Sequence, residues 1–258
     1  METSEQFAEV VAQLRAAGCV FAEDEATLLI EAANGPALPA LVDRRVVGEP
    51  LEHVLGWASF AGLRVPVHPG VFVPRRRTEL VAELAVQHVP TGGTFVDLCC
   101  GGGAIALAVA TARPGAEVWA SDIDPAAVTL AARSLGPHGG HAVAGDMDAA
   151  LPPHLPGTCD VVASCPPYVP SGQLALMPRE ARDYEPVAAL DGGPDGTELQ
   201  ARVFEAAARL LRPGGVAIVE TSENLAPLTL ERAGAAGLRA RLERDPTRDA
   251  VVVVGELR

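Results

Sequence analysis

The sequence is poor in positive charge and in aromatic side chains. Its 258 residues include 20 Lys and Arg against 33 Asp and Glu, which gives a formal net charge of −13. A nucleic-acid surface needs Lys and Arg to displace counterions from phosphates, so we expect no nucleic-acid partner. Aromatic residues make up 4% of a chain that is 48% hydrophobic, so its core must consist mainly of Ala, Val and Leu. The acidic balance is compatible with a neutral or cationic substrate.

Long apolar runs and metal-ligand spacings are also missing. No run approaches the roughly 20 apolar residues that span a bilayer, and Met1–Val10 is polar and acidic, unlike a signal peptide. We therefore expect a cytoplasmic protein with no membrane partner. The five cysteines are an odd number, and they show no metal-binding spacing because Cys99 and Cys100 are adjacent and the others stand apart. This usage predicts reduced thiols and no bound metal.

The residues that are present divide the chain into three parts. Residues 1–55 carry apolar side chains at helical spacing and predict a small N-terminal helical domain. In residues 56–74 apolar and aromatic residues are interrupted by Gly and Pro, which predicts a β-hairpin linker. Residues 75–258 then hold a larger domain that contains the remaining strands and helices.

Strands alternate with helices in this larger domain, which predicts an α/β fold with a doubly wound, seven-stranded, Rossmann-like sheet. The expected helices are 80–89, 104–112, 126–135, 204–211 and 228–235. The expected strands are 94–98, 117–121, 141–144, 160–164 and 216–221, closed by an antiparallel pair at 238–243 and 250–257. Ligands bind at the carboxyl ends of the strands in such sheets, so the residues that follow each strand become the candidates for a site.

Acidic residues and glycines lie at three of these strand ends. The first strand runs into Asp97-x-x-x-Gly-Gly-Gly103, the second ends at Asp122 and the third at Asp146. Glycines between a strand and a helix let the backbone close on a ligand, and a carboxylate at the next strand end can accept ribose hydroxyls. The pattern favours nucleoside binding over simple turn caps. A dinucleotide oxidoreductase is disfavoured because the third glycine of the G-x-G-x-x-G spacing is missing.

The motifs taken together resemble those of class I S-adenosylmethionine-dependent N-methyltransferases, and most closely the HemK/PrmC-type protein-glutamine methyltransferases. The likeness covers residues 50–225 and includes Pro74-Arg-Arg-Arg-Thr-Glu79, Asp122-Ile-Asp-Pro125 and Cys165-Pro-Pro-Tyr168. It implies that residues 75–258 bind S-adenosylmethionine with Asp97, Gly101 and Gly103 at the methionine end, Asp122 at the ribose and Asp146 at the adenine. The full expected set is Thr78, Asp97, Cys99, Gly101, Gly103, Asp122, Ile123, Asp146, Met147 and Cys165.

Two residues depart from the family pattern. Cys165 stands where the family usually has the Asn of Asn-Pro-Pro-Tyr, whose amide orients the nitrogen that receives the methyl group. A thiol is a weaker hydrogen-bonding group than an amide. Cys99 replaces the first glycine of the loop, a change we expect to be tolerated with Cys99 at negative φ. Cys165, Pro166 and Tyr168 are expected to line the acceptor pocket.

The cysteine leaves the methyl acceptor open among three alternatives. We favour the guanidinium of arginine or of a similar small amino-acid metabolite, because a cationic group with several N–H donors is matched by the nearby carboxylates. These are Glu79, Glu180, Asp183, Glu185 and Asp191, of which Glu185 is the preferred catalytic candidate. The second alternative is a glutamine amide of a peptide chain release factor, held by backbone acceptors. The third is a non-catalytic S-adenosylmethionine-binding scaffold.

Overall fold

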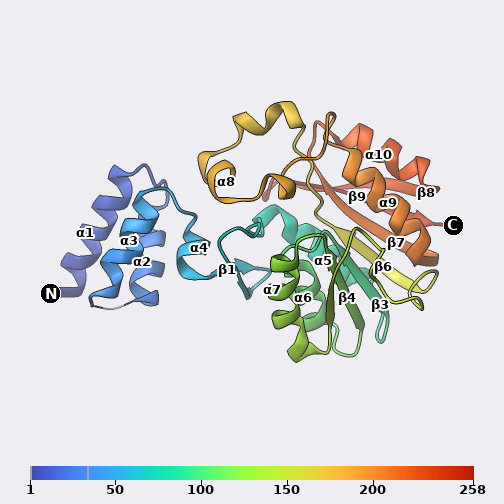
Figure 1. The fold of residues 1–258 in the computed structure, drawn as a ribbon, viewed down its shortest axis with the longest axis horizontal. Helices are drawn as coiled ribbons and strands as arrows, with labels where there is room; N and C mark the ends of the chain where they lie inside the picture. The colour runs from blue at the N-terminus through green and yellow to red at the C-terminus, as the bar shows by residue number, and fades with distance from the viewer. Residues whose placement is uncertain (1, 34) are drawn as a thin grey trace.

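The computed structural model describes residues 2–33 and 35–258 and begins with four helices. These are α1 (Glu2–Ala16), α2 (Ala22–Ala32), α3 (Ala37–Val46) and the short α4 (Leu51–Leu55). They bury one small core that includes Leu14, Leu29 and Val42, and they lie at one end of the molecule (Figure 1). Arg45 of α3 is buried in this group and pairs with Glu25 of α2 at 2.6 Å.

A β-hairpin connects these helices to the rest of the chain. Its strands, β1 (Trp57–Phe60) and β2 (Leu63–Pro66), pair antiparallel with Phe60 opposite Leu63. Phe60 and Val65 are buried in the same core as helix α5 (Glu79–His88), which follows the 3-10 turn η1 (Arg76–Thr78). The linker is therefore packed onto the main domain through its own apolar side chains.

The main domain is built on a seven-stranded sheet in the order β5-β4-β3-β6-β7-β9-β8, which confirms the predicted α/β class. Strands β3 to β7 run parallel, and β9 pairs antiparallel with both β7 and β8. The bounds are β3 (Thr94–Leu98), β4 (Glu117–Asp122), β5 (His141–Ala144), β6 (Cys159–Ser164), β7 (Leu211–Thr221), β8 (Leu238–Asp245) and β9 (Ala250–Leu257).

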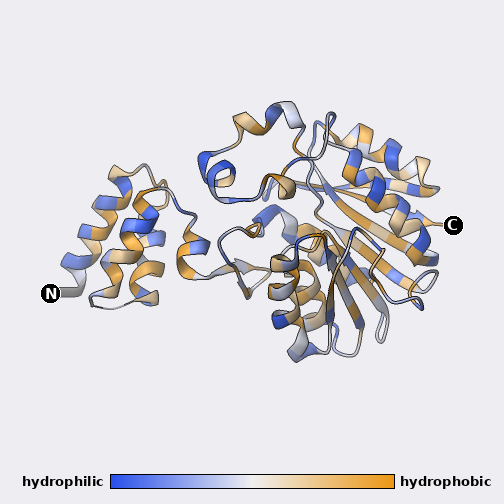
Figure 2. Cartoon of the chain, viewed as in Figure 1, coloured by the Kyte–Doolittle hydropathy of each residue, from blue (hydrophilic) through white to orange (hydrophobic). Residues whose placement is uncertain are grey.

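Helices cover both faces of the sheet, as a doubly wound fold requires. Helices α5, α6 (Ala104–Ala112) and α7 (Pro125–Leu135) share one core with alternate strand residues such as Phe95 and Ile218. Helix α9 (Glu198–Leu210) packs on the other face with Val96 and Val219 of the same strands, and α10 (Ala226–Ala235) contributes Ala233. Figure 2 shows the hydrophobic colour concentrated on the central strands. Successive strand residues point to opposite faces, which explains why these strands are apolar throughout.

The segment between β6 and α9 carries short helices that the sequence did not predict. They are η3 (Ser171–Leu176), α8 (Arg179–Tyr184) and η4 (Val187–Ala189). Arg45 of the N-terminal helices pairs with Glu180 of α8 at 2.7 Å, so this segment contacts both parts of the chain. Helix α9 also begins at Glu198, six residues before the predicted start, and β7 begins at Leu211 rather than at residue 216. Among the described residues, no helix combines the length and apolarity needed to cross a membrane.

Candidate active site

A cavity of about 660 Å³ lies at the carboxyl ends of β3, β4, β5 and β6. Eight of the ten residues expected to bind the cofactor line it: Thr78, Cys99, Gly101, Asp122, Ile123, Asp146, Met147 and Cys165. The sheet brings them together because parallel strands end at one edge. Residues of the hairpin and its exit, including Pro66 and Phe72, complete the wall and were not singled out from the sequence.

Asp122 fixes the glycine loop. One carboxylate oxygen accepts from the backbone N–H of Gly101 at 2.8 Å, and the other accepts from the backbone N–H of Asp124 at 2.9 Å. Burial raises the pKa of Asp122 above its ordinary value, and these backbone hydrogen bonds oppose the shift. Ile123, beside it, is 68% exposed and offers an apolar surface to the cavity. Ribose binding by Asp122 stays a prediction.

Asp97 lies behind the cavity wall, fully buried. One oxygen accepts from the backbone N–H of Ala106 in α6 at 3.1 Å, while the other has no hydrogen-bond partner within the described part of the chain. Burial raises the pKa of this carboxyl to about 8. An unpartnered buried acceptor suits a cationic donor such as the ammonium of a methionine moiety. Asp97 itself does not line the cavity, so its role at the methionine end of the cofactor stays a prediction.

The loop after β3 corrects one sequence expectation. Cys99 adopts φ of +54°, the left-handed region, rather than the negative φ that was expected to make the cysteine tolerable. A residue with a Cβ costs about 1–2 kcal/mol in this conformation, so the surrounding structure must hold it there. Gly103 has φ of +80°, and a Cβ on it would lie 2.9 Å from the Cβ of Ala131 in α7. Gly103 therefore serves the close approach of α7, behind the cavity.

Asp146 makes an ion pair that the sequence did not reveal. Both of its carboxylate oxygens accept from Nη2 of Arg202 in α9 at 2.7 Å, and Arg202 also lines the cavity. Binding of an adenine amine by Asp146 stays a prediction, and it would have to share these oxygens with Arg202. Met147 is held next to it because its backbone carbonyl accepts from the Ser121 hydroxyl at 2.7 Å.

A second cavity, of about 390 Å³, adjoins the first. The expected acceptor residues Cys165, Pro166 and Tyr168 line it. The two cavities have four residues in common: Phe72, Cys165, Pro167 and Ala189. A methyl donor in the larger cavity would therefore lie directly against an acceptor in the smaller one, which is the arrangement that in-line transfer needs.

Three side chains form a network at the smaller cavity: Tyr168 and Arg77, which line it, and Glu220, which does not. The Tyr168 hydroxyl donates to Glu220 Oε1 at 2.9 Å, and Arg77 Nε donates to the same oxygen at 3.2 Å. The Arg77 guanidinium also lies 5.9 Å from the centre of the Tyr168 ring. Burial and the neighbouring Glu220 charge raise the pKa of Tyr168 well above its ordinary range, so its phenol stays protonated. Glu220 was not singled out from the sequence, although it lies near a strand end, like Asp122. Arg77 was noted there only as part of the Pro74-Arg-Arg-Arg-Thr-Glu79 motif.

The preferred catalytic carboxylate is already paired. Both oxygens of Glu185 accept from Arg75 at 2.6 and 2.7 Å, and one also accepts from the backbone N–H of Val73. Burial raises the pKa of Glu185, and the Arg75 charge opposes the rise. Its geometry is that of a structural anchor for the acceptor segment.

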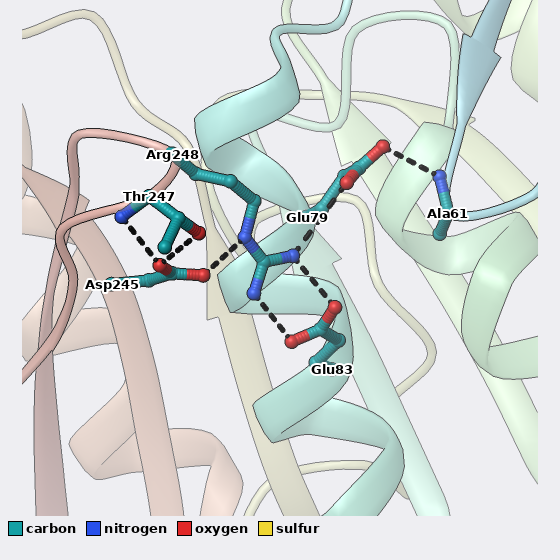
Figure 3. Close-up of polar contacts among 6 residues, drawn as sticks. All are labelled: Ala61, Glu79, Glu83, Asp245, Thr247 and Arg248. Atoms are coloured by element: carbon teal, nitrogen blue, oxygen red, sulfur yellow. Dashed lines mark hydrogen bonds and ion pairs between the residues drawn. The ribbon is translucent and has the colours of Figure 1, made fainter.

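The other four carboxylates proposed for a guanidinium also have partners within the chain. Glu79 accepts from the backbone N–H of Ala61 at 3.0 Å and lies 3.6 Å from Arg248, in the cluster of Figure 3. Glu180 pairs with Arg45, and Asp183 pairs with Arg179 of its own helix. Asp191 accepts from the Ser171 hydroxyl and the Gly193 backbone. The carboxylates that motivated a guanidinium acceptor are thus engaged by the protein itself.

Comparison with known sequences agrees with this architecture. Residues 62–179 match the family described as Methyltransferase small domain. A release factor glutamine methyltransferase of Mycolicibacterium smegmatis is 39% identical over 225 residues, covering 85% of this chain and 79% of the relative. A second, from Bifidobacterium longum, is 36% identical and covers 81% and 83%. A 4-amino-L-phenylalanine/4-methylamino-L-phenylalanine methyltransferase of Streptomyces pristinaespiralis is 37% identical and covers 72% and 66%.

Solved structures show the same fold. A methyltransferase of Pyrococcus furiosus superposes with a TM-score of 0.57 at 19% identity, covering 77% of this chain and 90% of that one. The 16S rRNA N2 G1207 methyltransferase of Thermus thermophilus, solved with AdoMet and guanosine, has a TM-score of 0.55 at 24% identity and covers 78% and 50%. The chain belongs to the HemK/PrmC-type family of class I methyltransferases and is an S-adenosylmethionine-dependent N-methyltransferase.

Proposed function

We propose that this enzyme methylates the side-chain amide nitrogen of a glutamine in a peptide chain release factor. The observation that carries the proposal is the similarity to the Mycolicibacterium smegmatis release factor glutamine methyltransferase, which extends over most of both chains. The acceptor cavity supports it, because its lining is neutral or internally paired: Arg75 is matched by Glu185 and Arg77 by Glu220. A neutral amide suits such a lining.

The chemistry required of the chain is orientation. An amide nitrogen is a poor nucleophile because its lone pair is delocalised, so its two hydrogens must be held while the nitrogen points at the methyl group. Bound S-adenosylmethionine supplies that methyl group from its sulfonium. Backbone carbonyls of the Pro-Pro turn and the Cys165 sulfur are the acceptors available beside the shared wall, and the Tyr168 ring supports the planar amide. This accounts for activity without an asparagine at position 165.

A small amino acid with a planar nitrogen is the second candidate. It is supported by the Streptomyces pristinaespiralis relative, which is named as a methyltransferase of the free amino acids 4-amino-L-phenylalanine and 4-methylamino-L-phenylalanine. The guanidinium version has less support, since the carboxylates expected to bind it pair with residues of the chain.

Methyl-labelled S-adenosylmethionine separates these acceptors. The full-length enzyme is incubated in parallel with an intact bacterial release factor, with free arginine and with 4-amino-L-phenylalanine. We expect label in the release factor, located by mass spectrometry on one glutamine side chain.

The matched control is the release factor with that glutamine changed to alanine, which should take up no label. Label in a free amino acid and none in the release factor would refute the proposal. Cofactor binding by calorimetry without transfer to any of the three would favour the non-catalytic scaffold.

A further inference from the structure

Glu220 holds an unexplained carboxylate oxygen beneath the acceptor cavity. The residue has no exposed surface, and its Oε1 accepts from both Tyr168 and Arg77. Its Oε2 has no hydrogen-bond partner of normal length among residues 2–33 and 35–258. Leaving a buried carboxylate oxygen without a hydrogen-bond donor is costly, so such an atom calls for a weaker partner or a function.

The sheet register places Cys165 next to this oxygen. Ser164, the last residue of β6, is the parallel partner of Val219 of β7, so Cys165, which directly follows β6, comes next to Glu220 of β7. Ala163 and Ile218, two residues earlier, both face the α5–α6 core, and side chains alternate along a strand. Cys165 and Glu220 therefore point to the same face, side by side.

The electrostatics of the thiol agree with this placement. Burial, followed by the Glu220 charge, raises the pKa of Cys165 well above its ordinary value, so the thiol keeps its hydrogen. The Thr78 hydroxyl lies 3.8 Å from the sulfur, and both it and the nearby Arg77 charge oppose the rise in the thiol pKa. A protonated thiol beside a carboxylate donates its hydrogen, because an ionised carboxylate can only accept.

We propose that Glu220 is a positioning residue of the acceptor pocket, whose Oε2 accepts the Cys165 S–H and so turns the sulfur lone pairs toward the methyl-acceptor nitrogen. Because Glu220 is buried and does not line the cavity, it acts through its neighbours. The same carboxylate fixes the Tyr168 hydroxyl, so one residue sets the orientation of both acceptor-side groups. This role rests on the proposed function for its effect on rate, whereas the proposed S–H contact does not depend on which acceptor is methylated.

Glu220→Gln tests the direction of the hydrogen bond. A glutamine Nε2–H would donate to the sulfur, occupy a lone pair and release the S–H toward the cavity. The infrared S–H stretching band of Cys165, assigned by its loss in Cys165→Ala, should move to higher frequency in Glu220→Gln. With the labelled acceptor, kcat should fall roughly tenfold, while KM and the affinity for S-adenosylmethionine remain within about twofold. An unmoved band would overturn the proposal even if methylation of the release factor were established.

A second pair of variants keeps the test valid if Glu220→Gln does not fold. Cys165→Ser retains one donor and a stronger acceptor in the same place, so it should keep kcat within about threefold. Cys165→Ala has neither and should lose about tenfold. Equal kcat values for the two variants would overturn the positioning role. If no release factor is methylated, the proposed function fails, and the infrared band still decides the S–H contact.

Discussion

At the residue scale, ionisation of the buried Asp97 carboxyl opposes folding. Its pKa is about 8 in the folded protein, against an ordinary value of 3.8, because burial disfavours the carboxylate. Between these values the folded protein holds a proton that the unfolded chain lacks. The free energy of unfolding should therefore fall as pH rises, by up to about 1.4 kcal/mol per unit, and level off above pH 8. Asp97→Asn removes this pH-dependent loss of stability. Denaturant unfolding from about pH 5 to 8.5 should therefore show the free energy of unfolding of the variant rising progressively relative to that of the wild type.

Asp148→Asn provides a control of opposite sign. The Arg209 side chain lowers the pKa of Asp148 by hydrogen bonding to it, so this carboxylate stabilises the fold above its ordinary pKa and loses that contribution as pH falls. Its variant should be less stable than wild type at neutral pH and converge with it in acid. Parallel curves for Asp97→Asn and wild type across the range would contradict the assignment of the raised pKa to Asp97.

Site residues could be predicted from the sequence where an acidic side chain lies at the end of a predicted strand. Asp97, Asp122 and Asp146 follow that rule, and Glu220 satisfies it too but was overlooked because no motif surrounded it. Their partners were not predictable, since Arg202 lies 56 positions from Asp146 and Arg77 lies 143 from Glu220. The left-handed φ of Cys99 was missed for a related reason. The hydrogen bond from Gly101 to Asp122 fixes the loop, and it becomes apparent only when the strands are assembled.

At the scale of elements, the contact of α6 with α7 depends on a missing side chain. Gly103→Ala would place a Cβ 2.9 Å from the Ala131 Cβ and 3.1 Å from its backbone Cα, at φ of +80°. The backbone conformation and the overpacking together should lower the free energy of unfolding by about 2–4 kcal/mol. Gly101→Ala is the matched control, because Gly101 also has positive φ but has open space around it, so only the smaller conformational loss of about 1 kcal/mol is expected. Equal losses in urea unfolding would refute the packing role.

The long elements of the sheet were predictable and the short ones were not. Apolar runs and helical spacing located α6 and β3 with their observed ends. In contrast, η3, α8 and η4 each follow a proline and have six residues or fewer, too few to form without tertiary contacts. Their position depends on Arg45 and Arg75, which come from parts of the chain more than 100 residues away.

At the scale of the whole molecule, these two arginines hold the acceptor segment from outside the sheet. Arg75 binds Glu185 from the linker side, and Arg45 joins Glu180 of α8 to the N-terminal helices. Glu180→Gln removes the second contact, while Arg45 keeps its buried pair with Glu25. Because Glu180 is half exposed, global stability should change by less than about 1 kcal/mol. Amide hydrogen exchange should nevertheless become faster in both α8 and the last turn of α3, since each loses its anchor to the other.

Asp183→Asn separates this coupling from a local effect on α8. Asp183 lies in the same helix and carries the same charge, but its partners Arg179 and Arg182 are both within α8. Its variant should speed exchange in α8 and leave α3 unchanged. If Glu180→Gln also left α3 unchanged, the Arg45 contact would not couple the two parts of the molecule. Faster exchange in α3 with Glu180→Gln alone would mean that the N-terminal helices help to hold the segment that forms the wall of the acceptor pocket.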